Sequence, residues 1–303
     1  METDDQCRGR RAGAHAQATP PRNDDDPLRD VVHAALLAEF SEANAYRQLI
    51  AGAAGLGMQA CAVELCGGVA LRCPDDGLGP LMNRVIGLGL REPITGQMIA
   101  ALNEHYHGLP GTWCVELSPP AMTPEGVALL RTIPLRRGLA TAMLAIDCGR
   151  ELHWPTSLSV VRYEGRPNRE AAAIQAEVFG VSPALRSVLE VAPRQPGLRQ
   201  WLAYDGSNPV GACLSSVHGQ SSWFGWSATL PQHRGRGVQR ALLARCVEDA
   251  AAAGCRWMTA ETAIGTAARP DPSFVNLRRA GFVELYRRHN HLFLPRRSHA
   301  PAT

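Results

Sequence analysis

The sequence predicts an α/β fold built from two tandem units, and three observations lead to this prediction. Residues 222–282 contain a run of strand character, a connection with two glycines, an amphipathic helix and a second strand. The same order of elements occurs earlier, where residues 83–90 correspond to 223–230 and residues 112–117 to 256–261. A stretch at 148–156 with a glycine and a proline separates the two series, and 303 residues suffice for two domains.

The first unit begins after a polar segment. Residues 1–26 have no periodic apolar face and are expected to form a disordered tail. From residue 27 a helix is predicted, with Val31, Val32 and Ile50 on one buried face, and the glycines between 52 and 57 end it. Residues 58–72 are predicted to form a strand hairpin that turns at Gly67 and Gly68. The further predicted elements are strands at 83–90, 112–117 and 139–146 and helices at 93–108 and 123–131.

The second unit has the same alternation of strands and helices. Strands are predicted at 158–163, 198–204 and 210–217 and helices at 168–179 and 182–191, followed by the series at 222–282 and a last strand at 283–294. The expected organisation is therefore a tail at 1–26, a first domain at 27–148, a linker at 149–156, a second domain at 157–297 and a tail at 298–303.

The connection between the strand and the helix of the second unit has the features of an anion site. It consists of Gln232, His233, Arg234, Gly235, Arg236 and Gly237, and Val238 begins the helix. The first amides of a helix are unpaired and lie at its positive dipole end, and glycines allow a ligand to approach the backbone closely. This arrangement favours a phosphate group, and a pyrophosphate in particular.

Two kinds of pyrophosphate loop are compatible with this pattern. The dinucleotide-binding fingerprint needs a small residue at position 240, where this chain has Arg240, although Glu261 stands where an acid could bind a ribose. This alternative stays open. The segment more closely resembles the GNAT N-acetyltransferase superfamily, whose acyl-CoA loop is (Arg/Gln)-x-x-Gly-x-(Gly/Ala), here Gln232-x-x-Gly235-x-Gly237. Residues 276–282 are also similar to the penultimate helix of that family, which often ends in Gly-Phe.

The resemblance implies a fold and an activity. It implies two tandem acetyltransferase-like domains, each with a mixed, largely antiparallel sheet flanked by helices, and a transfer of an acetyl group from acetyl-CoA to an amine by direct attack. The amides of residues 233–238 would bind the pyrophosphate, with Arg234 and Arg236 in reach of the phosphates. The first domain is expected to be a degenerate copy, because its corresponding connection has Glu92 and Pro93.

The catalytic residues that the resemblance implies are incomplete. The family often has a tyrosine that protonates the departing thiolate, but Leu277 occupies that position. Tyr286 is a candidate substitute, and Glu261 is a candidate general base whose pKa burial beside Trp223 or Trp226 would raise. The alternatives are a packing tyrosine and a capped or solvent-facing glutamate. If catalysis is lost, the protein would be an acyl-CoA sensor or scaffold.

The composition excludes several other functions. All 31 basic residues are arginines, which excludes lysine bases, Schiff-base lysines and a P-loop lysine. A net charge of +3 with dispersed arginines gives no support for a nucleic-acid partner, and no apolar run approaches the roughly 20 residues that span a bilayer. Nine cysteines, mostly within apolar runs, suggest a reducing cytoplasm. No group of histidines and cysteines has zinc-site spacing, so no metal is expected.

Overall fold

The computed structural model describes residues 30–74 and 79–293. Its α-helices are α1 (Val31–Gly55), α2 (Gly79–Met82), α3 (Gly96–His105), α4 (Pro124–Leu130), α5 (Arg169–Phe179), α6 (Pro183–Val191), α7 (Val238–Ala252) and α8 (Pro272–Ala280). Its strands are β1 (Cys61–Leu65), β2 (Gly68–Arg72), β3 (Arg84–Ile86), β4 (Trp113–Leu117), β5 (Leu135–Asp147), β6 (Ser159–Tyr163), β7 (Leu198–Asp205), β8 (Asn208–His218), β9 (Ser221–Thr229), β10 (Trp257–Ala263) and β11 (Val283–Phe293). In the described part of the chain, no helix is both long enough and apolar enough to cross a membrane.

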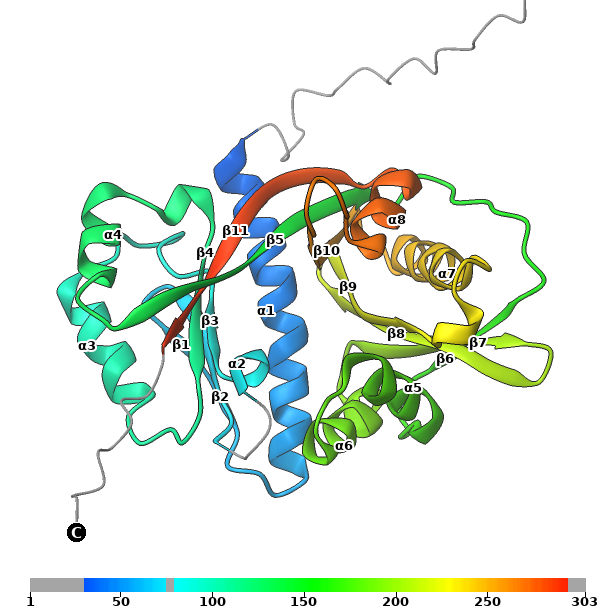
Figure 1. Ribbon diagram of the computed structural model, residues 1–303, viewed down its shortest axis with the longest axis horizontal. Helices are drawn as coiled ribbons and strands as arrows, with labels where there is room; N and C mark the ends of the chain where they lie inside the picture. Colours follow the sequence, from blue (N-terminus) through cyan, green and yellow to red (C-terminus); the bar gives the residue numbers. More distant parts are fainter. Residues whose placement is uncertain (1–29, 75–78, 294–303) are drawn as a thin grey trace, which may run out of the picture.

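The strands form one continuous sheet in the order β1-β2-β3-β4-β11-β5-β10-β9-β8-β7-β6 (Figure 1). Two pairings, β3 with β4 and β9 with β10, are parallel, and the others are antiparallel. The mixed, largely antiparallel α/β architecture predicted from the sequence is thereby confirmed. The two halves share this sheet, however, and do not form a separate sheet each.

The two halves exchange their last strands. β5, from the first half, lies between β10 and β11 of the second half, and β11 pairs with β5 on one edge and with β4 of the first half on the other. Both strands are long and cross the centre of the molecule together, as the green and red ribbons of Figure 1 show. The chain boundary expected at residues 149–156 falls in the connection from β5 to β6, so β5 packs with the half that follows this boundary.

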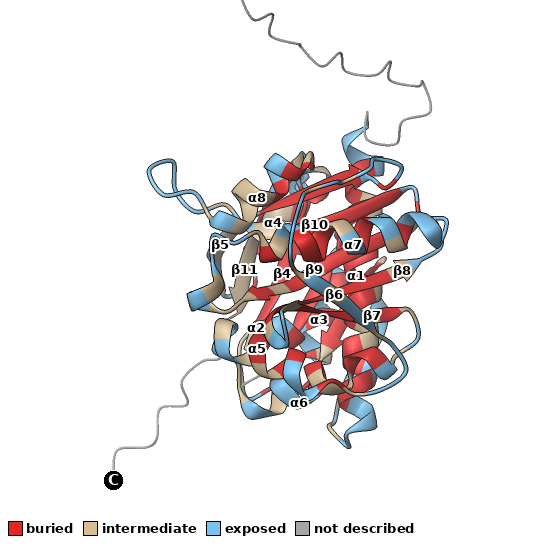
Figure 2. Ribbon diagram, turned by 90° about the vertical axis from the view of Figure 1, so that its right-hand side faces the viewer, coloured by how far each residue is buried: buried red, intermediate tan, exposed pale blue. Residues whose placement is uncertain are grey.

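Both faces of the sheet are covered, and the strand period of two decides which side chain lies on which face. On β8 and β9, Cys213 and Phe224 pack with α7 and α8, whereas their neighbours Leu214 and Trp223 pack with α1 and α6. The strands of the second half are accordingly buried along their centres (Figure 2).

Helix α1 covers the middle of the sheet and contacts strands of both halves. Asp30 caps its first turn by accepting a hydrogen bond from the amide of Val32. The predicted buried face is wrong at its start, because Val31 and Val32 are exposed, while Ile50 is buried as predicted. The buried face is formed largely by alanines, whose small side chains let the helix approach the strands closely.

The first half differs in detail from the sequence prediction. The strand predicted at 83–90 is limited to β3, because Gly87 and Gly89 have positive φ angles of 78° and 81° that turn the chain out of the sheet. The helix predicted from residue 93 begins at Gly96, with Thr95 as its cap. The hairpin predicted at 58–72 is confirmed as β1 and β2. The tails expected at 1–26 and 298–303 lie outside the described residues.

Candidate functional site

The loop between β9 and α7 presents unpaired amides at the start of a helix. Gly235 and Gly237 both have φ angles of +80°, a conformation that residues with a Cβ rarely adopt, and Gly237 is the N-cap of α7. Within the part of the chain that the structure describes, the backbone amides of residues 235–240 donate to no other group. Since α7 has 15 residues, its dipole adds a partial positive charge at this end. The loop therefore has the geometry of an anion site.

The side chains of this loop differ in their exposure. Gln232, Arg234 and Arg236 are exposed, and Arg236 donates to Asp205 across 3.2 Å. His233 is partly buried and ends the short 3-10 helix that precedes the glycines. Val238 is buried at the first position of α7, where its side chain packs against the backbone at Gly211. Val238 thus fixes the helix start, while the side chains of Gln232, Arg234 and Arg236 face solvent.

Next to the loop, strands β9 and β10 diverge. Their parallel pairing runs from Ser221 with Trp257 to Phe224 with Ala260 and stops there. The register of β9 shifts at this point, and Trp226 has a left-handed φ of +52°. A cavity of about 380 Å³ opens where the strands separate. It is lined by residues from the first half, including Tyr46, Leu81 and Arg84, and from the second half, including Trp226, Glu261 and Leu277.

Glu261 lies at the floor of this cleft, and its pKa contradicts the sequence expectation. Its side chain is 18% exposed and pairs with Arg288 at 3.1 Å and with Arg84 at 3.8 Å. Burial alone would raise the pKa of Glu261, but the two guanidinium groups outweigh burial and lower it to about 2. The predicted rise in the pKa was wrong, because the prediction took into account burial by the tryptophans but not the positive charges of the two arginines. A carboxylate with so low a pKa is a weak base near neutral pH.

Tyr286 lies away from this cleft, on the face of the sheet that α1 covers. Its side chain packs with Ala35, Ala38 and Met143, and its hydroxyl donates to Glu39 across 2.8 Å. Burial, followed by the charge of Glu39, raises the pKa of Tyr286. Leu277, by contrast, lines the cleft and is 1% exposed, so the position at which the family often has an acid does face the cleft.

Behind Glu261 lies a buried ionic cluster that the sequence analysis missed. It consists of Glu39 and Glu42 on α1, Arg84 on β3, Glu116 on β4 and Arg288 on β11, with Glu261 at its edge. Burial raises the pKa of Glu42 and of Glu116, despite the nearby arginines. Acidic residues at 39 and 42 within an alanine-rich helix are the only signal in the sequence, since their partners are more than 40 residues away in the chain.

This cluster is poorly suited to a metal ion, although it has three carboxylates close together. Oxygen atoms of Glu42, Glu116 and Glu261 lie within 4.8 Å of one another. The Nη2 atom of Arg288 lies 2.5, 2.9 and 3.1 Å from oxygens of these three residues. The guanidinium group thus already occupies the position between the carboxylates that a cation would need.

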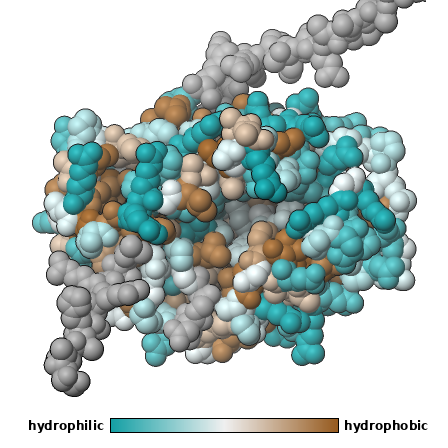
Figure 3. Space-filling model, in the orientation of Figure 1, coloured by the Kyte–Doolittle hydropathy of each residue, from teal (hydrophilic) through white to brown (hydrophobic). Residues whose placement is uncertain are grey.

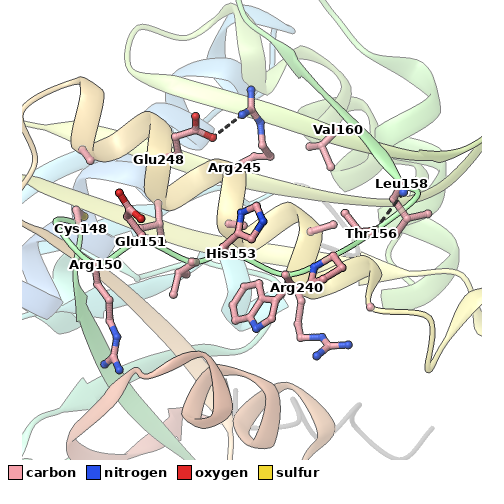
Figure 4. A pocket seen from close by; sticks show the side chains of 18 of the residues that line it. Cys148, Arg150, Glu151, His153, Thr156, Leu158, Val160, Arg240, Arg245 and Glu248 are labelled. Carbon is pink, nitrogen blue, oxygen red and sulfur yellow. Dashed lines mark hydrogen bonds and ion pairs between the residues drawn. The ribbon is translucent and has the colours of Figure 1, made fainter. Parts of the chain in front are cut away.

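A larger cavity, of about 630 Å³, extends from the glycine loop along α7 (Figure 4). One wall of this cavity is α7, and the other is the connection between β5 and β6. The connection that joins the two halves of the chain therefore also lines a cavity. The cavity includes Arg236 and Gly237 of the loop and is therefore continuous with it. The Arg240 guanidinium lies 6.0 Å from the ring centre of Trp154, at the end nearest the loop.

Comparisons with known proteins agree with this geometry. Residues 171–270 match the model of the acetyltransferase (GNAT) family, so this part of the chain is a GNAT domain. The match spans the loop, the cleft strands β9 and β10, and α7. The GNAT resemblance predicted from the sequence is thereby confirmed. No curated protein sequence matches the chain significantly.

Solved structures extend the likeness to most of the chain. A GCN5-related N-acetyltransferase from Kribbella flavida has a TM-score of 0.59 at 16% identity, with 86% of this chain and 96% of that chain covered. A tandem GNAT protein from the clavulanic acid biosynthesis pathway has a TM-score of 0.56 at 18% identity, with 89% and 95% covered. A conserved protein of unknown function from Staphylococcus epidermidis has a TM-score of 0.54 at 12% identity, with 78% and 94% covered. At these identities the likeness concerns the fold alone, which this chain shares with these proteins, one of them a tandem GNAT protein.

Proposed function

We propose that this protein transfers an acetyl group from acetyl-CoA to an amine by direct attack, with one cofactor site per chain. The observation that supports this most strongly is the row of free amides at residues 235–240 beside the diverging strands β9 and β10. A pyrophosphate at the amides would leave the thioester arm directed into the cleft. The strand amides freed by the divergence could then polarise the thioester oxygen.

The same site suggests how the proton of the amine is handled. In the proposed reaction the amine nitrogen attacks the thioester carbon, the carbon–sulfur bond breaks, and the thiolate takes up the proton that the nitrogen loses. Glu261 would accept a hydrogen bond from the amine and would not remove its proton, because its pKa is about 2. The amine would therefore enter as the neutral free base, and the first half would complete the acceptor side of the cleft through Tyr46, Leu81 and Arg84.

The cavity along α7 is the proposed position of the adenosine end of CoA. Trp154 offers an aromatic face, and Arg240 and Arg150 offer positive charge in a cavity continuous with the loop. The corresponding connection of the first half is unsuited to the same ligand. There the Thr95 hydroxyl already accepts a hydrogen bond from the amide of Met98, and Glu92 adds a negative charge. The first half is thus proposed to bind no CoA.

Calorimetry with acetyl-CoA and thiol release with a panel of amines test this proposal. We expect one equivalent of acetyl-CoA per chain, and thiol release with at least one amine. Two equivalents would place a second cofactor in the first half and contradict the single-site assignment.

A second candidate, an acyl-CoA sensor without turnover, is favoured by one observation. Leu277 fills the cleft position at which the family often has an acid, and it is almost fully buried there. Tight binding of acetyl-CoA with no thiol release on any amine would support the sensor. A CoA thiol leaves readily without a strong acid, which is why transfer remains the leading proposal.

A further inference from the structure

The first half contains a cavity of its own, of about 460 Å³, beneath α4. Part of its wall is apolar and includes Leu117 at the end of β4, Leu130 on α4 and Ile133 in the connection that follows. In the space-filling view, brown apolar side chains lie between teal polar ones on the left-hand side, where α3 and α4 are found (Figure 3). The volume lies within the range of small-molecule sites.

Strand pairing places one wall of this cavity at the counterpart of the Glu261 wall of the proposed acetyl-transfer cleft. In the second half, the exchanged strand β5 pairs with β10, and Met143 lies opposite Glu261. In the first half, the exchanged strand β11 pairs with β4, and His289 lies opposite Leu117. By the sequence correspondence of 112–117 with 256–261, Leu117 takes the place of Glu261. The position that corresponds to Glu261 is therefore apolar and lacks a carboxylate.

The polar side of this cavity favours an anion. Its polar lining residues are Arg131, Arg137, His289 and His291, and among the described residues that line it there is no carboxylate. Arg137 donates to Nε2 of His289, a contact that suits the neutral imidazole with Nε2 unprotonated. Burial and the charge of Arg137 lower the pKa of His289, in agreement with this state. The two exposed arginines thus supply the charge at the mouth, and apolar side chains form the interior.

We propose that this cavity binds a small apolar carboxylate, with its carboxylate paired to Arg137 and its apolar body against Leu117, Leu130 and Ile133. An apolar ligand of this size gains from burial, and an arginine binds a carboxylate through two parallel hydrogen bonds. The site is separate from the acetyl-CoA loop and does not depend on the function proposed above.

Hexanoate, hexanamide and hexylamine are suitable probes, because they share an apolar chain and differ in the charge of the end group. With the full-length protein, calorimetry and thermal unfolding should show that hexanoate binds and raises Tm, whereas hexylamine does not. Arg137→Gln should weaken hexanoate binding tenfold or more. Arg136→Gln is the matched control, because Arg136 is exposed on the same strand but does not line the cavity. It should leave the affinity unchanged.

Three outcomes would overturn the proposal: equal affinity for the acid, the amide and the amine, an equal loss in both arginine variants, or no binding at all. If Arg137→Gln fails to fold, crystals of the unchanged protein soaked with 4-bromobenzoate give an independent answer. Anomalous density for bromine beneath α4 would support the site, and density elsewhere would overturn it. Hexanoate should also bind unchanged in Gly237→Val, the variant that is expected to weaken CoA binding, which separates the two sites.

Discussion

Replacement of Gly237 by valine is the sharpest test of the anion loop. At a φ of +80° a residue with a Cβ is strained by about 1–2 kcal/mol, and a β-branched residue by more. The new Cβ would lie 3.3 Å from the Arg240 Nη2 atom, which can move away, so the main cost is backbone strain and displacement of the neighbouring amides. Loss of a single charge-assisted hydrogen bond to a phosphate costs about 1.5–3 kcal/mol. We therefore expect the affinity for acetyl-CoA to fall by about 2 kcal/mol or more, roughly 30-fold in Kd.

The chain offers a matched control for the strain itself. Gly254, just after the other end of α7, has a φ of +82° and no atom within 4 Å of an added Cβ. Gly254→Val should lower the free energy of unfolding by about as much as Gly237→Val does, because the backbone strain is the same, and it should leave the affinity for acetyl-CoA unchanged. Calorimetry and urea unfolding on both variants measure the two effects separately. Equal Kd values for Gly237→Val and the unchanged protein, with the fold intact by circular dichroism, would refute the assignment of the loop.

Three further predictions follow from the same geometry. With the adenosine 3′-phosphate of CoA beside Arg240 and Trp154, Arg240→Gln should weaken the binding of CoA more than that of dephospho-CoA, as measured by calorimetry. An equal loss of affinity for the two ligands would contradict this position of the 3′-phosphate. Leu277→Tyr places a hydroxyl at the cleft and should raise thiol release, by up to the roughly 10²–10⁴-fold of general acid catalysis, without changing the Kd for acetyl-CoA. Because Leu277 packs in the core, Tm is measured as well, and unchanged thiol release from a folded variant would contradict the prediction. Because the folded pKa of Glu261 is lowered to about 2 from 4.5, its stabilising effect is present above pH 4.5 and is lost as the pH falls toward 2. Between pH 4.5 and 2, the free energy of unfolding of Glu261→Gln, measured with urea, should therefore fall less steeply with pH than that of the unchanged protein. Equal slopes for the two proteins would show that the ion pairs of Glu261 contribute nothing to stability. Glu42 and Glu116, whose pKa values are raised, are present in both proteins and affect both slopes alike.

The sequence indicated the local features that depend on short stretches of chain. The glycine spacing at 235 and 237 predicted a loop at the start of a helix that a ligand can approach closely, and in the structure both glycines have positive φ angles, which only glycine adopts at little cost. The hairpin turn near Gly67 was predicted for a similar local reason, and Gly67 has a φ angle of +70°. The match of residues 171–270 to the GNAT family agrees with the motif on which the resemblance rested.

The tertiary structure decided what depends on pairing between distant segments. The sequence of β5 does not show whether this strand pairs with strands of the first half or inserts between β10 and β11 of the second half. Both arrangements require the same alternation of buried and exposed side chains. The pKa of Glu261 was likewise beyond the sequence, because it is the sum of desolvation and of charges from Arg84 and Arg288, which lie on different strands. Local residue order determines loops and caps, whereas electrostatic energies depend on three-dimensional distances that only the assembled sheet defines.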